Sequence, residues 1–130
     1  MKQSVFEIIS NREIAPRTWE MVLGGDTSDI TAPGQFVNIK LEGFYLRRPI
    51  SVCDVNDDKL TIIYKVVGKG TEAMAKMGEG AQLDILTGLG NGFDTSKSGD
   101  APLLIGGGVG AAPMFYLARC LAKEGKKVTV

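Results

Sequence analysis

The sequence predicts a mainly β fold, in which a six-stranded antiparallel barrel is followed by a single β-α-β unit. Between Ser4 and Leu86, short runs rich in β-branched residues recur at roughly ten-residue spacing, with turn residues between them. After a polar stretch that ends at Asp100, the pattern changes to a continuous apolar run, a helical period and a second apolar run. We therefore expect a barrel domain over residues 1–98 and an incomplete α/β domain over residues 99–130.

The expected strands are apolar runs that alternate with polar residues. In the third run, Val37, Ile39 and Leu41 alternate with Asn38 and Lys40, which is the period of a strand with one buried face. Antiparallel strands of this kind pack one face on a core and leave the other in solvent. The six runs are SVFEIIS, TWEMVL, GQFVNIKL, PISVCDV, KLTIIYKVV and AQLDIL.

Two helices are expected. The first is short and lies between the fifth and sixth strands, where Thr71 can cap its start, Met74 and Met77 form its apolar face, and Gly78 ends it. The second covers residues 111–124 and shows apolar residues at helical spacing. It connects the apolar strand PLLIGGG to the strand KVTV, which makes one β-α-β unit.

Composition excludes several classes of function. The 15 basic and 15 acidic side chains cancel, so no net field attracts the protein to nucleic acid or to an anionic membrane. No run approaches the roughly 20 apolar residues of a membrane span, and the start of the chain lacks a signal peptide, so we expect a cytoplasmic protein. The chain has no histidine, which excludes imidazole chemistry. Cys53 and Cys120 form no C-x-x-C pair, so we expect buried, reduced thiols and no metal site.

A glycine-rich turn carries the first chemical motif. Residues 106–111 read G-x-G-x-x-A, directly after an expected strand and before an expected helix. Glycines let the backbone approach a pyrophosphate, and the helix start offers free N–H groups and a positive dipole end. This predicts the first turn of a Rossmann-like nucleotide-binding domain, although a tight turn without a ligand is the alternative. The acidic residue that would hold a ribose about 20 residues later falls beyond the last residue.

Three further motifs precede this turn. In YLRRPISV, paired arginines lead into a strand that presents Ser51, and guanidinium groups bind phosphate through two parallel hydrogen bonds. In VGKGTEAM, Gly70 and Thr71 lead into the short helix, whose start can hold an anion. A solvated strand edge and an ordinary turn and cap are the respective alternatives. In TGLGNGFD, alternate glycines favour a close approach of the backbone to a planar ligand or to the next domain.

In this order and spacing, the four motifs resemble the ferredoxin reductase family of flavoproteins, in which the barrel holds FAD and the following α/β domain holds NAD(P)H. The segments LRRPISV, IIYKVVGKGT, GLGNGF and LLIGGGVGAAPM look most like those of the electron-transfer subunits of type B dihydroorotate dehydrogenase. The resemblance covers essentially the whole chain. Members of that family continue to a [2Fe-2S] segment, whose four thiolates two cysteines cannot supply. A fragment of a longer chain and a truncated gene product are the two alternatives, and we expect a fragment because the β-α-β unit leaves apolar strand edges unpaired.

The resemblance also implies a set of cofactor-binding residues. It places Arg48 toward the FAD pyrophosphate and Ser51 near the isoalloxazine edge, and it assigns Gly70 and Thr71 to the helix start that receives the pyrophosphate. It implies no catalytic and no metal-binding residue. The complete set is Arg48, Pro49, Ile50, Ser51, Ile63, Tyr64, Lys65, Gly70 and Thr71 for FAD, with Gly106, Gly107, Gly108 and Gly110 for the nicotinamide nucleotide.

The implied function is electron transfer between NAD(H) and an FMN-bearing dihydroorotate dehydrogenase catalytic subunit, through FAD and the iron–sulfur cluster of the full-length protein. That assembly is a heterotetramer of pyrimidine biosynthesis. With an incomplete nucleotide site, we expect this chain to bind NADH weakly or not at all, and we expect the strands at 103–105 and 128–130 to pair with a neighbouring molecule. Two alternatives stay open: the flavin subunit of a sulfide dehydrogenase or NADH-dependent ferredoxin:NADP oxidoreductase, and a flavin-free barrel that serves as an interaction module.

Overall fold

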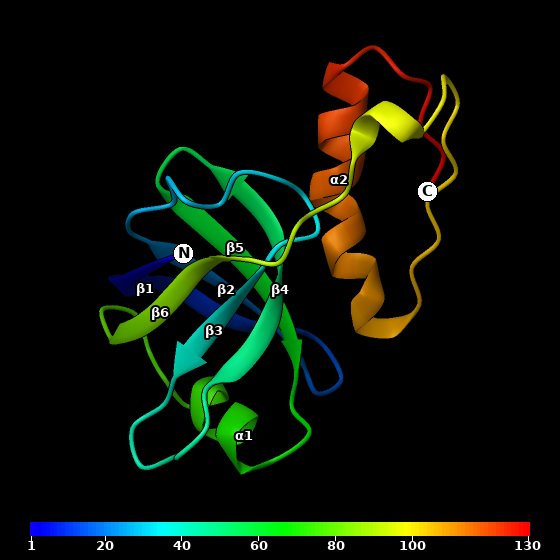
Figure 1. Ribbon diagram of the computed structural model, residues 1–130. Coiled ribbons are helices and arrows are strands. Elements are labelled where there is room, and N and C mark those ends of the chain that lie inside the picture. Colours follow the sequence, from blue (N-terminus) through cyan, green and yellow to red (C-terminus); the bar gives the residue numbers. More distant parts are fainter.

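The computed structural model describes residues 1–130 and contains a closed barrel (Figure 1). The strands follow one another around the barrel in the order β1-β2-β5-β4-β3-β6, and every neighbouring pair is antiparallel. The predicted six-stranded antiparallel barrel is therefore confirmed. The strands are β1 (Lys2–Ala15), β2 (Thr18–Gly24), β3 (Phe36–Lys40), β4 (Arg48–Asn56), β5 (Lys59–Lys65) and β6 (Gln82–Leu89).

Strand alternation fills the barrel interior. In β5, the side chains of Leu60, Ile62 and Tyr64 are at most 1% exposed, while Ile63 and Lys65 between and after them face outward. All six strands contribute to one cluster of 16 buried residues. Each fully buried large apolar side chain stabilises the fold by roughly 1.5–3 kcal/mol, so this cluster is the main source of stability.

The short helix α1 (Lys69–Ala75) closes one end of the barrel, with Met74 fully buried in the core (Figure 1). The prediction that Thr71 caps this helix is wrong, because the helix begins two residues earlier and Gly68 is its N-cap. Thr71 instead stabilises the start from within, since its Oγ1 accepts hydrogen bonds from the backbone N–H groups of Val67 at 2.9 Å and Gly68 at 3.2 Å. The helix also ends before the expected Gly78.

The last third of the chain contains two short 3₁₀ turns, η1 (Thr95–Lys97) and η2 (Gly108–Gly110), and the helix α2 (Ala111–Lys123). The prediction of this helix is confirmed, and it packs beside the barrel against β4 (Figure 1). The expected strands at 103–105 and 128–130 are not formed. A single parallel bridge joins Leu103 to Thr129, because two parallel segments without further neighbours make a marginal ladder. Neither α1 nor α2 has the length and apolar character that a membrane-crossing helix needs.

The glycine loop, residues 88–92 at the end of β6, approaches the barrel itself, while the expected approach to a planar ligand or to the next domain stays a prediction. Gly88, Gly90 and Gly92 have positive φ values of 72°, 83° and 75°. A Cβ atom on Gly88 would lie 2.8 Å from the Asp29 carbonyl oxygen, and one on Gly92 would lie 2.7 Å from Ala32 Cβ. Gly88 and Gly92 are therefore required by contact with the loop between β2 and β3.

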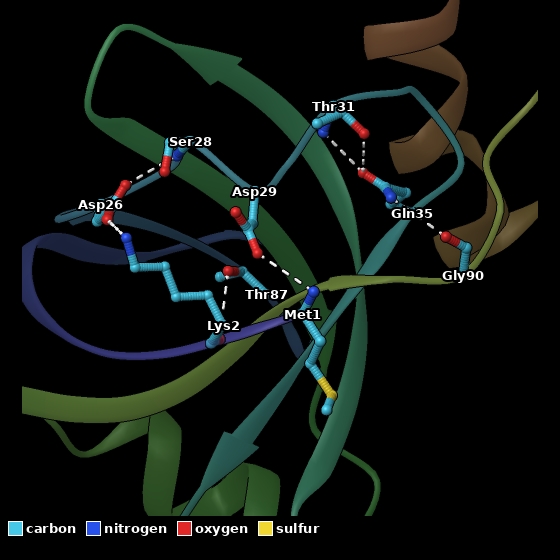
Figure 2. A network of polar contacts seen from close by, with 9 residues as sticks. All are labelled: Met1, Lys2, Asp26, Ser28, Asp29, Thr31, Gln35, Thr87 and Gly90. Carbon is cyan, nitrogen blue, oxygen red and sulfur yellow. Dashed lines mark hydrogen bonds and ion pairs between the residues drawn. The ribbon is translucent and has the colours of Figure 1, made fainter.

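A polar network ties these segments together, as Figure 2 shows. The buried Gln35 side chain accepts a hydrogen bond from Thr31 N at 2.8 Å and donates one to the Gly90 carbonyl at 3.1 Å. The ammonium group of Met1 pairs with Asp29 at 3.2 Å. These contacts thus hold three segments together at one end of the barrel: the loop after β2, the glycine loop and the start of β1.

Candidate functional site

A cavity of about 370 Å3 opens on the outer face of β4 and β5. This volume is in the range of small-molecule sites. All the barrel residues that the sequence assigned to FAD line this cavity except Gly70, and Val67 and Val109 complete its wall. The lining residues are Arg48, Pro49, Ile50, Ser51, Ile63, Tyr64, Lys65, Val67, Thr71 and Val109.

The cavity exists because β4 and β5 separate. The two strands pair from Val52 opposite Ile62 to Asn56 opposite Lys59 and no further. Beyond that point residues 48–51 pair with β3 on one side, and residues 63–65 pair with β2 on the other. The facing edges of the two strands are therefore without a ladder partner, and backbone groups at such an edge can bind a ligand.

Tyr64 can reach a ligand only through its backbone. Its side chain is 1% exposed inside the barrel, and its hydroxyl donates a hydrogen bond to Asn11 Oδ1 at 2.8 Å. Burial raises the pKa of Tyr64 to about 12. The phenol is thus a structural group of the core, while its main chain runs along the cavity.

Arg48 is held at the end of the cavity by three contacts. Its guanidinium carbon lies 5.2 Å from the centroid of the Phe44 ring, and its Nη1 donates a hydrogen bond to the Leu46 carbonyl. Its guanidinium also covers Gly70, where a Cβ atom would lie only 2.8 Å from Arg48 Cζ. Gly70 therefore contributes to the site indirectly, because any side chain at that position would displace the arginine.

The start of α1 adds backbone donors beside this charge. The Thr71 hydroxyl donates to the Gly68 carbonyl at 3.1 Å, so its proton is already used. Helix geometry leaves the first N–H groups, those of Lys69 and Gly70, without an intrahelical partner. The cavity lining itself contains Arg48 and Lys65 but no carboxylate, which favours an anionic ligand.

The predicted nucleotide loop lies next to this cavity. A second cavity, of about 620 Å3, is lined by Gly107 and Gly108 and shares Ile63, Lys65 and Val109 with the first. Gly106 and Gly110 line neither cavity. Gly106 is instead required by the turn, because its Cβ would lie 2.7 Å from Ala111 Cα. Two of the four predicted glycines therefore line a cavity beside the barrel.

Sequence reasoning missed three residues at the site. Val67 and Val109 are apolar side chains that are 74% and 48% exposed, and Phe44 lies under the Arg48 guanidinium. Phe44 lies in the turn before β4, where a spacing of four residues predicts no contact, so no sequence pattern pointed to it. No signal pointed to Val109, because it reaches the barrel only through the packing of α2.

The acidic and sulfur-containing side chains form no cluster at the site. No group of three or more His, Cys, Asp or Glu residues is placed to hold a metal ion. Both cysteines are free thiols; Cys53 is buried, and burial raises its pKa to about 11. Cys120 is only half-buried, so the expectation of burial is confirmed for Cys53 alone.

Comparison with solved structures defines the class of protein. The structure of an NADH-dependent reduced ferredoxin-NADP oxidoreductase, described for flavin-based electron bifurcation, has a TM-score of 0.87 and 30% identity and covers 96% of this chain and 46% of that chain. Phthalate dioxygenase reductase has a TM-score of 0.83 at 23% identity and covers 98% and 42%. The chain therefore has the FAD-binding fold of the ferredoxin reductase-like flavoproteins.

Within this class the sequence corresponds to one kind of subunit. The electron transfer subunit of dihydroorotate dehydrogenase B (NAD(+)) from Enterococcus faecalis (strain ATCC 47077 / OG1RF) is 42% identical over 98% of this chain and 51% of its own length. The subunit of the same name from Streptococcus mutans is 44% identical over 91% of this chain and 48% of its own length. The chain thus corresponds to a part of these electron transfer subunits and spans about half their length. No protein-family model matches the chain.

Proposed function

We propose that this chain is the FAD-binding part of an electron transfer subunit that serves a dihydroorotate dehydrogenase catalytic subunit. The observation that carries the proposal is the cavity between the separated edges of β4 and β5, which collects the residues assigned to FAD and contains two cations and no carboxylate. The names of the relatives supply the partner and the nicotinamide nucleotide.

The residues present fit FAD. Bound FAD supplies the hydride and single-electron chemistry, and the protein contributes position and tuning. Arg48 and the N–H groups at the start of α1 bind the pyrophosphate, and Ser51 offers a hydroxyl donor and acceptor to the flavin edge. Ile63 and Val109 add apolar surface to the wall of the cavity.

The wider assembly is proposed for the longer protein. It comprises a [2Fe-2S] cluster, an FMN-bearing catalytic subunit and a heterotetramer of pyrimidine biosynthesis in the cytoplasm. This chain contains the first glycine turn of the NAD(H) site, with Gly106, Gly107, Gly108 and Gly110, so NADH binding by the chain alone is weak or absent.

A second candidate keeps the flavin and changes the partner. It is the flavin subunit of a sulfide dehydrogenase or of an NADH-dependent ferredoxin:NADP oxidoreductase. The TM-score of 0.87 to a structure of the latter kind supports it. The higher identity to the dihydroorotate dehydrogenase subunits, 42% against 30%, favours the first candidate.

The testing experiment is a visible absorption spectrum of the purified chain after incubation with FAD, with FMN in parallel, followed by desalting. We expect flavin bands to remain with the protein for FAD and not for FMN. The retention of neither flavin would overturn the FAD site and favour a flavin-free interaction module. Addition of the dihydroorotate dehydrogenase catalytic subunit to the FAD-loaded chain, in a sedimentation experiment, then separates the two candidate partners.

A further inference from the structure

Strand β4 carries a bulge at Cys53. Val52 pairs with Ile62, and the next pair is Asp54 with Thr61, so Cys53 is an extra residue without an opposite partner. Strict alternation from the buried Val52 would direct Asp54 into the barrel core. The bulge shifts the phase, so that Asp54 lies on the outer face opposite Thr61.

Helix α2 covers this part of the outer face. Its Leu117 and Leu121 are 6% and 1% exposed, and Cys53 beside Asp54 is 6% exposed. Arg119 of α2 meets the carboxylate that the bulge turns outward, with Nη2 2.6 Å from Asp54 Oδ1. The same Nη2 donates a hydrogen bond to the Val55 carbonyl, so one arginine binds two consecutive residues of β4.

Asp54 lies on β4 three residues after Ser51 of the cavity lining, and Arg119 lies on the helix that follows Val109. Helix α2 begins at Ala111, directly after the η2 turn that carries Val109 into the cavity wall. Because a helix moves as a unit, the place of Val109 depends on how α2 is seated on β4. The guanidinium is further oriented by the Tyr116 ring, whose centroid lies 5.5 Å from Arg119 Cζ.

We propose that Asp54 and Arg119 are positioning residues that fix the nucleotide loop, residues 106–110, at the edge of the cofactor cavity. The extra residue at Cys53 makes this ion pair possible, because it turns Asp54 to the outer face of β4. The effect on flavin rests on the proposed function, whereas the seating of α2 does not. The two parts are therefore tested by separate measurements.

The first measurement uses the chain without flavin. Arg119→Met keeps the aliphatic stem and removes the charge, and Arg12→Met removes the exposed ion pair with Glu20 on β1 and β2 as a matched control. We expect amide hydrogen exchange over residues 106–117 to become at least tenfold faster in Arg119→Met only. Exchange that changes less than twofold in that segment would overturn the proposal. If Arg119→Met fails to fold, Asp54→Asn carries the same expectation and the same criterion.

The second measurement uses the FAD-loaded chain and iodide quenching of flavin fluorescence. We expect the quenching constant to rise at least twofold in Arg119→Met, because the nucleotide loop no longer covers the cavity, and to stay unchanged in Arg12→Met. Arg119→Lys restores the charge but cannot reach both the Asp54 carboxylate and the Val55 carbonyl equally well. Its quenching constant should therefore lie between those of the parent chain and Arg119→Met. Unchanged quenching in Arg119→Met would remove the link to the cavity. If no variant binds FAD, the proposed function fails, while hydrogen exchange still decides the seating of α2.

Discussion

Arg48 combines a permanent charge with a fixed position, so we expect FAD affinity to depend on it more than on any other residue of the cavity lining. The Phe44 ring and the Leu46 carbonyl orient its guanidinium toward the start of α1. Arg48→Ala should weaken FAD binding by about 2–3 kcal/mol, the scale of a charge-assisted hydrogen bond, which is roughly 30- to 150-fold in Kd. A fluorescence titration measures this, with Arg12→Ala as the control. An unchanged FAD affinity would remove Arg48 from the site.

Gly70 tests the position of the same guanidinium without changing its charge. A Cβ atom at Gly70 would overlap Arg48, whereas a Cβ atom at Gly78 would meet nothing within 4 Å. Gly70→Ala improves helix propensity by up to about 1 kcal/mol, so stability should not fall, but FAD affinity should fall about tenfold as Arg48 is displaced. Gly78→Ala should leave FAD affinity unchanged. Equal affinities for the two variants would contradict the contact.

The buried Tyr64 predicts a loss of stability in alkali. Burial raises its pKa from 10.0 to about 12, so the folded chain keeps a proton that the unfolded chain releases first. Since the folded pKa is the higher one, the stabilisation is complete below pH 10 and is lost as the pH rises toward 12. Urea unfolding at pH 9 and pH 11 should show a smaller decline in the free energy of unfolding for Tyr64→Phe than for the parent chain. Identical declines would contradict the assignment.

At the scale of elements, period-two patterns predicted the barrel because each strand buries one face. The same rule could not predict the bulge at Cys53, because PISVCDV reads as a regular strand until its partner on β5 is known. The run Leu103–Ile105 looks like a strand from its apolar residues, but a strand needs hydrogen-bonded neighbours, and here one bridge is formed. Thr71 resembled a cap because its hydroxyl does bind two N–H groups, although from inside the helix.

As with the fold, one part of the candidate site was predictable from the sequence and another part was not. The resemblance identified the lining of the cavity along β4 and β5, since those residues are contiguous in the sequence. It could not identify Val109 as part of the same wall, because that contact joins residues more than 40 positions apart through the seating of α2. The glycine loop was recognised as a place of close approach, but its partner, the loop around Asp29 and Ala32, depends on barrel closure.

The glycine loop also allows a test that separates backbone strain from steric overlap. Gly92 and Gly99 have φ values of 75° and 71°, but a Cβ at Gly92 would lie 2.7 Å from Ala32 Cβ, and one at Gly99 would meet nothing within 4 Å. Alanine at either position should cost about 1–2 kcal/mol from the left-handed backbone. Gly92→Ala should cost about 2 kcal/mol more, because a packed neighbour must shift. Thermal unfolding of both variants measures the difference, and equal midpoints would contradict the packing described for Gly92.

At the scale of the whole molecule, the barrel and the last third of the chain differ in how completely they satisfy their backbones. Every strand of the closed barrel pairs with a neighbour on each side over part of its length, and β4 and β5 separate only at the cavity. The bridge between Leu103 and Thr129 leaves both segments open beyond it. Apolar side chains are exposed at this place, with Leu103 at 65%, Ile105 at 83% and Val130 at 74%.

Open strand edges with exposed apolar side chains favour association between molecules. We therefore expect the sedimentation coefficient of the chain to rise with protein concentration, and Ile105→Lys to suppress the rise by placing a charge beside the open edge. Val5→Lys is the matched control. Val5 is also apolar and 61% exposed, but it lies on β1, which is a strand of the closed barrel. The control should associate like the parent chain, since Val5 is paired with Asp84 of β6 in the barrel and does not lie on the open segment at residues 103–105. Two outcomes would show that the open edge does not drive association. In the first, the parent chain stays monomeric at high concentration; in the second, Val5→Lys suppresses association as strongly as Ile105→Lys does.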